Sequence, residues 1–157
     1  MSDVTFTSAD IDQVLKEFVD SFSKPNSVNS DVIPNAMRQA IYENFVDEYG
    51  DGNWKPLAPA TVKDRIRKGF PGTNPILQRT GALLDSLINP NNSDHIEETT
   101  ASANGWTVDV GSNDERTPWL DQGTDDGHIP ARPFLTMDAR QEDRLAAAIE
   151  AYFDSLF

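Results

Sequence analysis

Apolar residues recur at helical spacing in three stretches of the chain. The first predicts a helix from Ser8 to Phe22, and the second predicts one that begins near Pro34 and stops before Gly50. The third predicts a closing helix opened by Thr136 or Asp138. We interpret the three apolar faces as core or subunit contacts rather than a cofactor site. Their residues are Ile11, Val14, Leu15, Phe18 and Phe22; Ile33, Met37, Ala40, Ile41 and Phe45; and Leu145, Ile149, Tyr152, Phe153 and Leu156.

Shorter elements are predicted between the first and last helices. The polar stretch Lys24 to Asp31 is interpreted as a linker, and Thr61 to Lys68 as a short helix closed by Gly69. Thr80 is placed to cap another short helix. The inward face of that helix is expected to consist of Leu83, Leu84 and Leu87.

Two strands are predicted from Ile96 to Ala103 and from Trp106 to Val110. Asn104 and Gly105 between them suit the positive backbone angles of a tight hairpin turn. The stretch Asn113 to Asp126 is mostly polar and is assigned no regular element. The predicted fold class is therefore α+β, a small single domain with helices packed around a hairpin-based antiparallel sheet and a helix at each end.

The length of 157 residues suits one domain with one core. We expect residues 1–31 to hold the first helix and the linker, residues 32–140 the core, and residues 141–157 the last helix. No apolar run approaches the roughly 20 residues that cross a bilayer, and Met1 to Asp10 lack the pattern of a signal peptide. We therefore expect the protein to stay in the cytoplasm where it is made, without a membrane partner. Without Cys, disulfides and the common zinc modules are excluded.

The charge balance is strongly acidic, with 26 Asp and Glu against 13 Lys and Arg and a formal net charge of -13. Proteins that track phosphates need the opposite sign. An excess of carboxylates keeps a surface hydrated in molar salt, where the repulsion between them is screened. The composition therefore fits a halophilic host, and the alternative is an ordinary acidic surface. Acidic groups would also repel a polyanion such as DNA, an explanation of the charge that the sequence leaves open.

Three segments carry motifs that occur together. The first contains Asn44-Phe45, then Trp54-Lys55-Pro56-Leu57 and Thr61; the second runs from Ile76-Leu77 through Thr80-Gly81 to Leu83 and Ser86. The third joins Trp119-Leu120-Asp121-Gln122-Gly123-Thr124 to Ile129-Pro130-Ala131-Arg132-Pro133-Phe134-Leu135. In this order and at these separations, the segments resemble the phage virion morphogenesis or tail-completion family of long-tailed viruses. The resemblance covers about Ala36 to Arg140 and departs from the family at Pro118-Trp119-Leu120.

The resemblance implies a structural protein of the virion neck, not an enzyme, without cofactor or metal. Copies are expected to form a ring that joins the DNA-filled capsid to the tail, with six copies favoured and twelve as the alternative. The implied partners are neck proteins on the portal or adaptor side and tail tube or tail terminator proteins, with DNA as a passing cargo that is repelled. Roles as a tail terminator or as a head-completion (stopper) protein remain open alternatives.

Four residues are candidates for the subunit interface. Trp54 and Trp119 lie in predicted loops, and aromatic loop residues are enriched at interface hot spots; the alternative is that they fold back on the core. Arg132 lies in a proline-stiffened segment and is suited to pair with the carboxylate of a neighbouring subunit or to form an intramolecular salt bridge that pins the segment to its own domain, the second being favoured. In Ile129 to Leu135 we expect an extended strap with Phe134 and Leu135 buried and Arg132 paired.

A remote alternative is a metal-dependent hydrolase. Its basis is a cluster of carboxylates with an imidazole, which would suit a hard divalent cation. The chain has no phosphate-binding glycine loop, nucleophile elbow or paired metal-binding His motif, and 18 Asp residues produce clusters by composition alone. The residues of the cluster are Asp121, Asp125, Asp126 and His128.

Overall fold

The computed structural model describes residues 8–21, 27–48, 54–102 and 105–155. Within these ranges the chain is a small single α+β domain with a two-stranded antiparallel sheet, as predicted. No helix of the described ranges is long and apolar enough to cross a membrane. The elements, in chain order, are α1 (Ser8–Ser21), the short π-helix η1 (Val28–Val32), α2 (Ile33–Asp47), α3 (Pro59–Arg67), α4 (Ala82–Ile88), β1 (His95–Ser102), β2 (Gly105–Ser112), α5 (Thr117–Gln122) and α6 (Ala139–Asp154).

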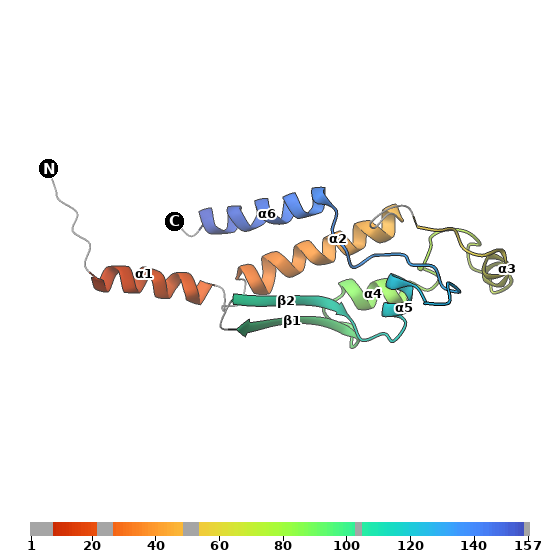
Figure 1. Cartoon of the computed structure of the whole chain (residues 1–157), viewed down its shortest axis with the longest axis horizontal. Coiled ribbons are helices and arrows are strands. Elements are labelled where there is room, and N and C mark those ends of the chain that lie inside the picture. The colour runs from red at the N-terminus through yellow and green to blue at the C-terminus, as the bar shows by residue number, and fades with distance from the viewer. Residues whose placement is uncertain (1–7, 22–26, 49–53, 103–104, 156–157) are drawn as a thin grey trace.

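Helix α2 is the central element of the domain. It lies between α6 on one side and the β1–β2 hairpin on the other, while α4 packs against both α2 and β2 (Figure 1). The apolar stripe predicted for this helix is confirmed where it faces the core, because Ala40, Ile41 and Phe45 are buried. Pro34 stands in the first turn, also as predicted.

The core is an apolar cluster in which helix side chains meet loop side chains. The rings of Phe45 and Phe134 are fully buried, and their centroids lie 5.1 Å apart. The Trp54 ring stands edge-on to Phe45 at 5.5 Å. Because Trp54 and Phe134 come from loops, a substantial part of this core has no helical or strand periodicity. The cluster consists of Ile41, Phe45, Trp54, Ile76, Leu83, Leu87 and Phe134.

The hairpin pairs β1 with β2 in register from His95 opposite Ser112 to Ser102 opposite Gly105. Gly105 has a φ of 139°, an angle that side chains rarely adopt, so glycine suits the position as the sequence predicted. The partner of Gly105 in the predicted turn, Asn104, lies outside the described residues.

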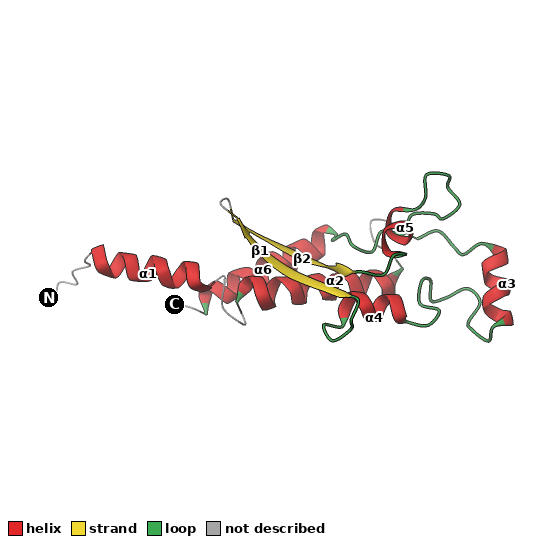
Figure 2. Ribbon diagram, turned by 90° about the horizontal axis from the view of Figure 1, so that it is seen from below, coloured by secondary structure: helices red, strands yellow, loops and turns green. Residues whose placement is uncertain are grey.

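Helix α1 forms where the periodicity predicted it, but its apolar face does not join the core. The side chains of Ile11, Val14, Leu15, Phe18 and Val19 are 42–56% exposed. The helix projects beyond the rest of the domain in both views (Figures 1 and 2). Near its C-terminal end the helix contacts α6: the Phe18 ring stacks on the Phe153 ring at 5.6 Å, and the Tyr152 hydroxyl donates a hydrogen bond to the Ser21 carbonyl. A core role for this face is therefore wrong; Phe22 lies outside the described residues.

Two polar stretches that were assigned no regular element contain helices. The supposed linker includes η1, where Ser27 and Ser30 cap each other's backbone and bury Val28 and Asn29. The stretch after Asn113 includes α5, whose Thr117 and Asp121 are buried. Both elements are short, and their buried faces include polar residues such as Asn29 and Asp121, so hydrophobic periodicity gives no signal for them.

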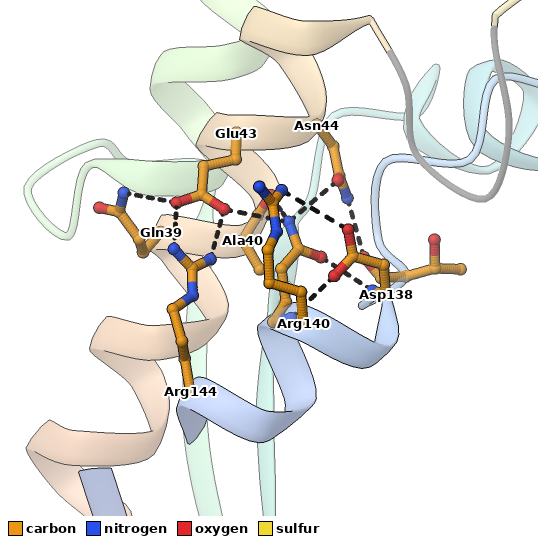
Figure 3. A network of polar contacts seen from close by, with 9 residues as sticks. Gln39, Ala40, Glu43, Asn44, Asp138, Arg140 and Arg144 are labelled. Atoms are coloured by element: carbon orange, nitrogen blue, oxygen red, sulfur yellow. Dashed lines mark hydrogen bonds and ion pairs between the residues drawn. The ribbon is translucent and has the colours of Figure 1, made fainter. Parts of the chain in front are cut away.

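The last helix begins at the predicted cap. The Asp138 carboxylate accepts a hydrogen bond from the Gln141 backbone, and the Gln141 side chain accepts one from the Asp138 backbone, which makes a capping box. The buried Gln141 amide also donates to the Ala40 carbonyl and the Asn44 side chain of α2. Figure 3 shows the polar network around this junction, with Glu43 and Arg144 paired across the two helices.

Candidate functional site

The segment Ile129 to Leu135, called the strap below, is an ordered run of chain without helix or strand, as predicted. The Asp121 carboxylate accepts hydrogen bonds from the backbone of Phe134 at 2.8 Å and of Leu135 at 3.0 Å. From the other side, the Asn44 side-chain amide donates to the carbonyls of Phe134 and Thr136. The strap is therefore fixed between α5 and α2 through its main chain.

The strap passes close over Gly123. At this position φ is 78°, and a Cβ atom would lie 2.7 Å from the Ala131 nitrogen and 2.8 Å from the Ile129 oxygen. Both neighbours are backbone atoms that cannot rotate away, so the turn after α5 requires glycine. Gly123 of the third motif segment thus has a structural reason.

Arg132 is paired within its own subunit, but not through the intramolecular salt bridge that the sequence favoured. It is 5% exposed, and its guanidinium donates to the backbone carbonyls of Lys55 at 3.1 Å and Pro56 at 3.4 Å. Its partners are main-chain oxygens rather than a carboxylate. Burial lowers the pKa of this guanidinium, and the charge of Glu48 offsets part of that effect.

The other interface candidates divide between the interior and the surface. Trp54 and Phe134 are buried, and the Trp54 indole donates to the Pro133 carbonyl, so both residues hold the strap to the core. Trp119 is 52% exposed and is the one of the four candidates available to a partner. Leu135 is 41% exposed, which corrects the prediction that it is buried; the strap turns Phe134 inward and its neighbour outward.

The three segments that carry the family resemblance meet in one place. Phe45 and Trp54 from the first, Leu83 from the second and Phe134 from the third belong to the same buried cluster. The motif residues therefore form a single packing unit, although they are separated by up to 89 positions along the chain.

The proposed hydrolase cluster is not assembled. The Asp121 carboxylate binds the strap backbone, and that of Asp126 accepts hydrogen bonds from the Thr124 hydroxyl and the His128 backbone. The latter bonds lower the pKa of Asp126, with the Thr124 hydroxyl as the main cause. Across the described ranges, no group of three or more His, Asp or Glu side chains is placed to hold a metal ion.

A cavity of about 650 Å³ lies between the loop that follows Trp54, helix α3, the start of α4 and the strap. The charged residues of its lining are mainly basic; Asp64 is the acidic one, and its carboxylate is already paired with Arg67 and Lys68. Sequence reasoning missed this site because its cations are spread over 78 positions. The basic residues of the lining are Lys55, Arg65, Arg79, Arg116, His128 and Arg132.

Arg65 is the second buried guanidinium of this cavity. The residue is 4% exposed; one of its terminal nitrogens donates to the Pro75 carbonyl at 3.0 Å, and its buried Nε has no hydrogen-bond partner. Over the described part of the chain, no carboxylate lies within 4.0 Å of Arg65 or Arg132. Buried charges are normally paired in direct contact, whereas these two guanidinium groups have no carboxylate in direct contact. The charge of Glu48 acts on Arg132 from farther away, and the Asp64 carboxylate of the lining is paired with Arg67 and Lys68.

Comparison with known proteins identifies no relative: no protein-family model, no curated protein and no solved structure matches the chain.

Proposed function

We propose that this chain is a structural subunit of the head-to-tail interface of a tailed virus, where copies assemble into a ring that joins the DNA-filled capsid to the tail. The observation that carries the proposal is the exposed apolar face of α1. Six copies are the favoured number and twelve the alternative, and a position as tail terminator or stopper is compatible with the same contacts.

An exposed apolar face on a projecting helix favours assembly. Contiguous apolar patches on a soluble protein mark interaction sites, because leaving them in water costs free energy. Four of the five large side chains of the α1 face are more than half exposed. On the same helix, Lys16 and Asp20 form an ion pair at 2.7 Å.

The motif residues support the same role in another way. They build the core and fix the strap, and the surface they leave outward includes Trp119 and Leu135, which are 52% and 41% exposed. Exposed aromatic and aliphatic side chains next to a rigid segment are suited to a subunit contact. The resemblance supplies the location of the assembly, in the virion neck.

Leu15→Asp tests the assembly in solution. Leu15 is 56% exposed, so the substitution should leave the monomer folded and abolish the oligomer that sedimentation velocity is expected to find for the wild type. Gln13→Asp is the matched control, since it adds the same charge to the polar face of the same helix and should assemble normally. Equal oligomers for wild type and Leu15→Asp would refute the role of α1.

The location is tested on the particle. A reconstruction of the head-to-tail joint of the virus that encodes the chain should contain this fold in a closed ring, and particles made with Leu15→Asp should give separate heads and tails. Density for the chain elsewhere in the particle, or normal joining by the variant, would overturn the proposed function.

A further inference from the structure

Positive charge is concentrated at one end of this acidic chain. Residues 54–80 contain six Lys and Arg and one Asp, a balance of +5, so the remaining residues sum to -18 against the total of -13. The segment includes α3, which lies at the opposite end of the molecule from α1 in both views (Figures 1 and 2). The molecule therefore has a cationic end and a strongly acidic remainder.

The cavity turns this cationic end into a site. Exposed cations are solvated and screened by salt, whereas the guanidinium groups of Arg65 and Arg132 are buried with backbone carbonyls as partners. A carbonyl satisfies the hydrogen bond but carries no full charge, and the more distant charge of Glu48 compensates that of Arg132 only in part. Two such charges facing one cavity favour an oxyanion there, since a carboxylate would supply both the charge and acceptors for the free N–H groups.

We propose that this cavity receives carboxylate groups from helix α1 of a second copy of the chain. The inference deepens the proposed function and rests on it, because it names the surface on which the exposed α1 face docks. Helix α1 carries Asp12, Glu17 and Asp20 against the single cation Lys16. Helix α1 is thus acidic as well as apolar, so the surface that binds it has to offer both positive charge and apolar contacts.

The cationic end offers apolar side chains as well as positive charge. Ile66, beside Arg65 on α3, is 60% exposed, and Trp119, beside the cavity residue Leu120, is 52% exposed. These side chains offer apolar contacts to the α1 face while the cavity takes its acids. Because donor and receiver lie at opposite ends of one molecule, the contact is head-to-tail, the kind that closes into a ring when its rotation allows.

The burial of the guanidinium groups also makes the contact resistant to salt. At molar salt the screening length falls to about 3 Å, which removes the attraction between exposed charges. Pairs formed with the buried guanidinium groups of this partly open cavity are screened less than pairs on the open surface. The burial of Arg65 and Arg132 would therefore suit a protein that works in concentrated salt, if the halophilic interpretation holds.

Arg79→Glu tests the receiver. Arg79 lines the cavity but is exposed, and its guanidinium lies over the Phe70 ring at 5.6 Å, so the monomer should fold normally. We expect association to weaken by about tenfold or more. Lys63→Glu is the matched control: it makes the same charge change on exposed α3 surface outside the cavity lining and should assemble within about twofold of the wild type.

Mixing the two blocked variants tests the direction of the contact. Arg79→Glu keeps its α1 and Leu15→Asp keeps its cavity, so each alone should remain monomeric and the mixture should form a 1:1 complex that cannot grow. Sedimentation velocity and mass photometry distinguish this complex from both monomer and ring.

The outcomes separate this inference from the proposed function. Wild-type assembly by Arg79→Glu, with Leu15→Asp still monomeric, would overturn the receiver and leave the α1 assembly intact. A wild-type protein that stays monomeric at every salt concentration would overturn both. Binding of a labelled DNA duplex that Arg79→Glu abolishes, with assembly unchanged, would assign the cavity to phosphate and overturn the second copy as its occupant.

Discussion

Truncating Phe134 should destabilise the domain severely. Its ring has no exposed surface and fills the space between Phe45 at 5.1 Å and Trp54 at 6.5 Å. The main chain on either side is fixed by Asn44 and Asp121, so the strap cannot move in to close the void. We therefore expect Phe134→Ala to cost about 3 to 5 kcal/mol, a large part of the stability of an ordinary domain.

The measurement is reversible unfolding by denaturant or heat, followed by circular dichroism at one fixed salt concentration. For a domain of this size the expected loss lowers the melting temperature by roughly 6 to 20 °C. Leu135→Ala is the control, because this adjacent residue of the strap is 41% exposed and should cost less than about 1 kcal/mol. Equal stabilities for the two variants would refute the account of the strap as an anchor held through Phe134.

Three further predictions concern polar groups. Arg132→Ala should lower the free energy of unfolding by about 1 to 3 kcal/mol, because the carbonyls of Lys55 and Pro56 lose their donor; unchanged denaturation curves would refute this. Hydrogen bonds, chiefly from Arg144, lower the pKa of Glu43 from its ordinary 4.5 to about 2, so its contribution is complete above pH 4.5 and lost as pH falls toward 2. Glu43→Gln should flatten the melting temperature across that window, and an unchanged profile would count against the pair. Finally, the melting temperature of the wild type should rise from low to molar salt, and a constant value would remove the halophilic interpretation.

The helices with long apolar stripes could be predicted from sequence because periodicity and caps act locally. Helix α2, the Asp138 cap and the hairpin follow from residues within a few positions of each other. Local patterns could not predict whether the apolar face of α1 is buried or exposed. Periodicity reports that one face is apolar, but whether that face meets its own core or another molecule depends on long-range packing.

The candidate site was less accessible to sequence reasoning. The strap and its buried Phe134 were predicted from proline spacing and apolar residues. The exposure of Leu135 depends instead on the direction of the strap where its backbone binds the Asp121 carboxylate. The cavity brings Arg65 and Arg132 together from positions 67 residues apart. No local pattern marks such a pair, and the excess of positive charge in residues 54–80 is the one signal that was available.

The Gln141 side chain links the first turn of α6 to helix α2, so local unfolding of that turn also affects the contact between the two helices. The same side chain that caps the helix also donates to the Ala40 carbonyl and to Asn44, so fraying of the first turn breaks the contact between the helices as well. Terminal turns usually exchange their amide hydrogens faster than the middle of a helix. Here the first turn of α6 should open together with its docking on α2, and its amides should share one protection factor with that interface.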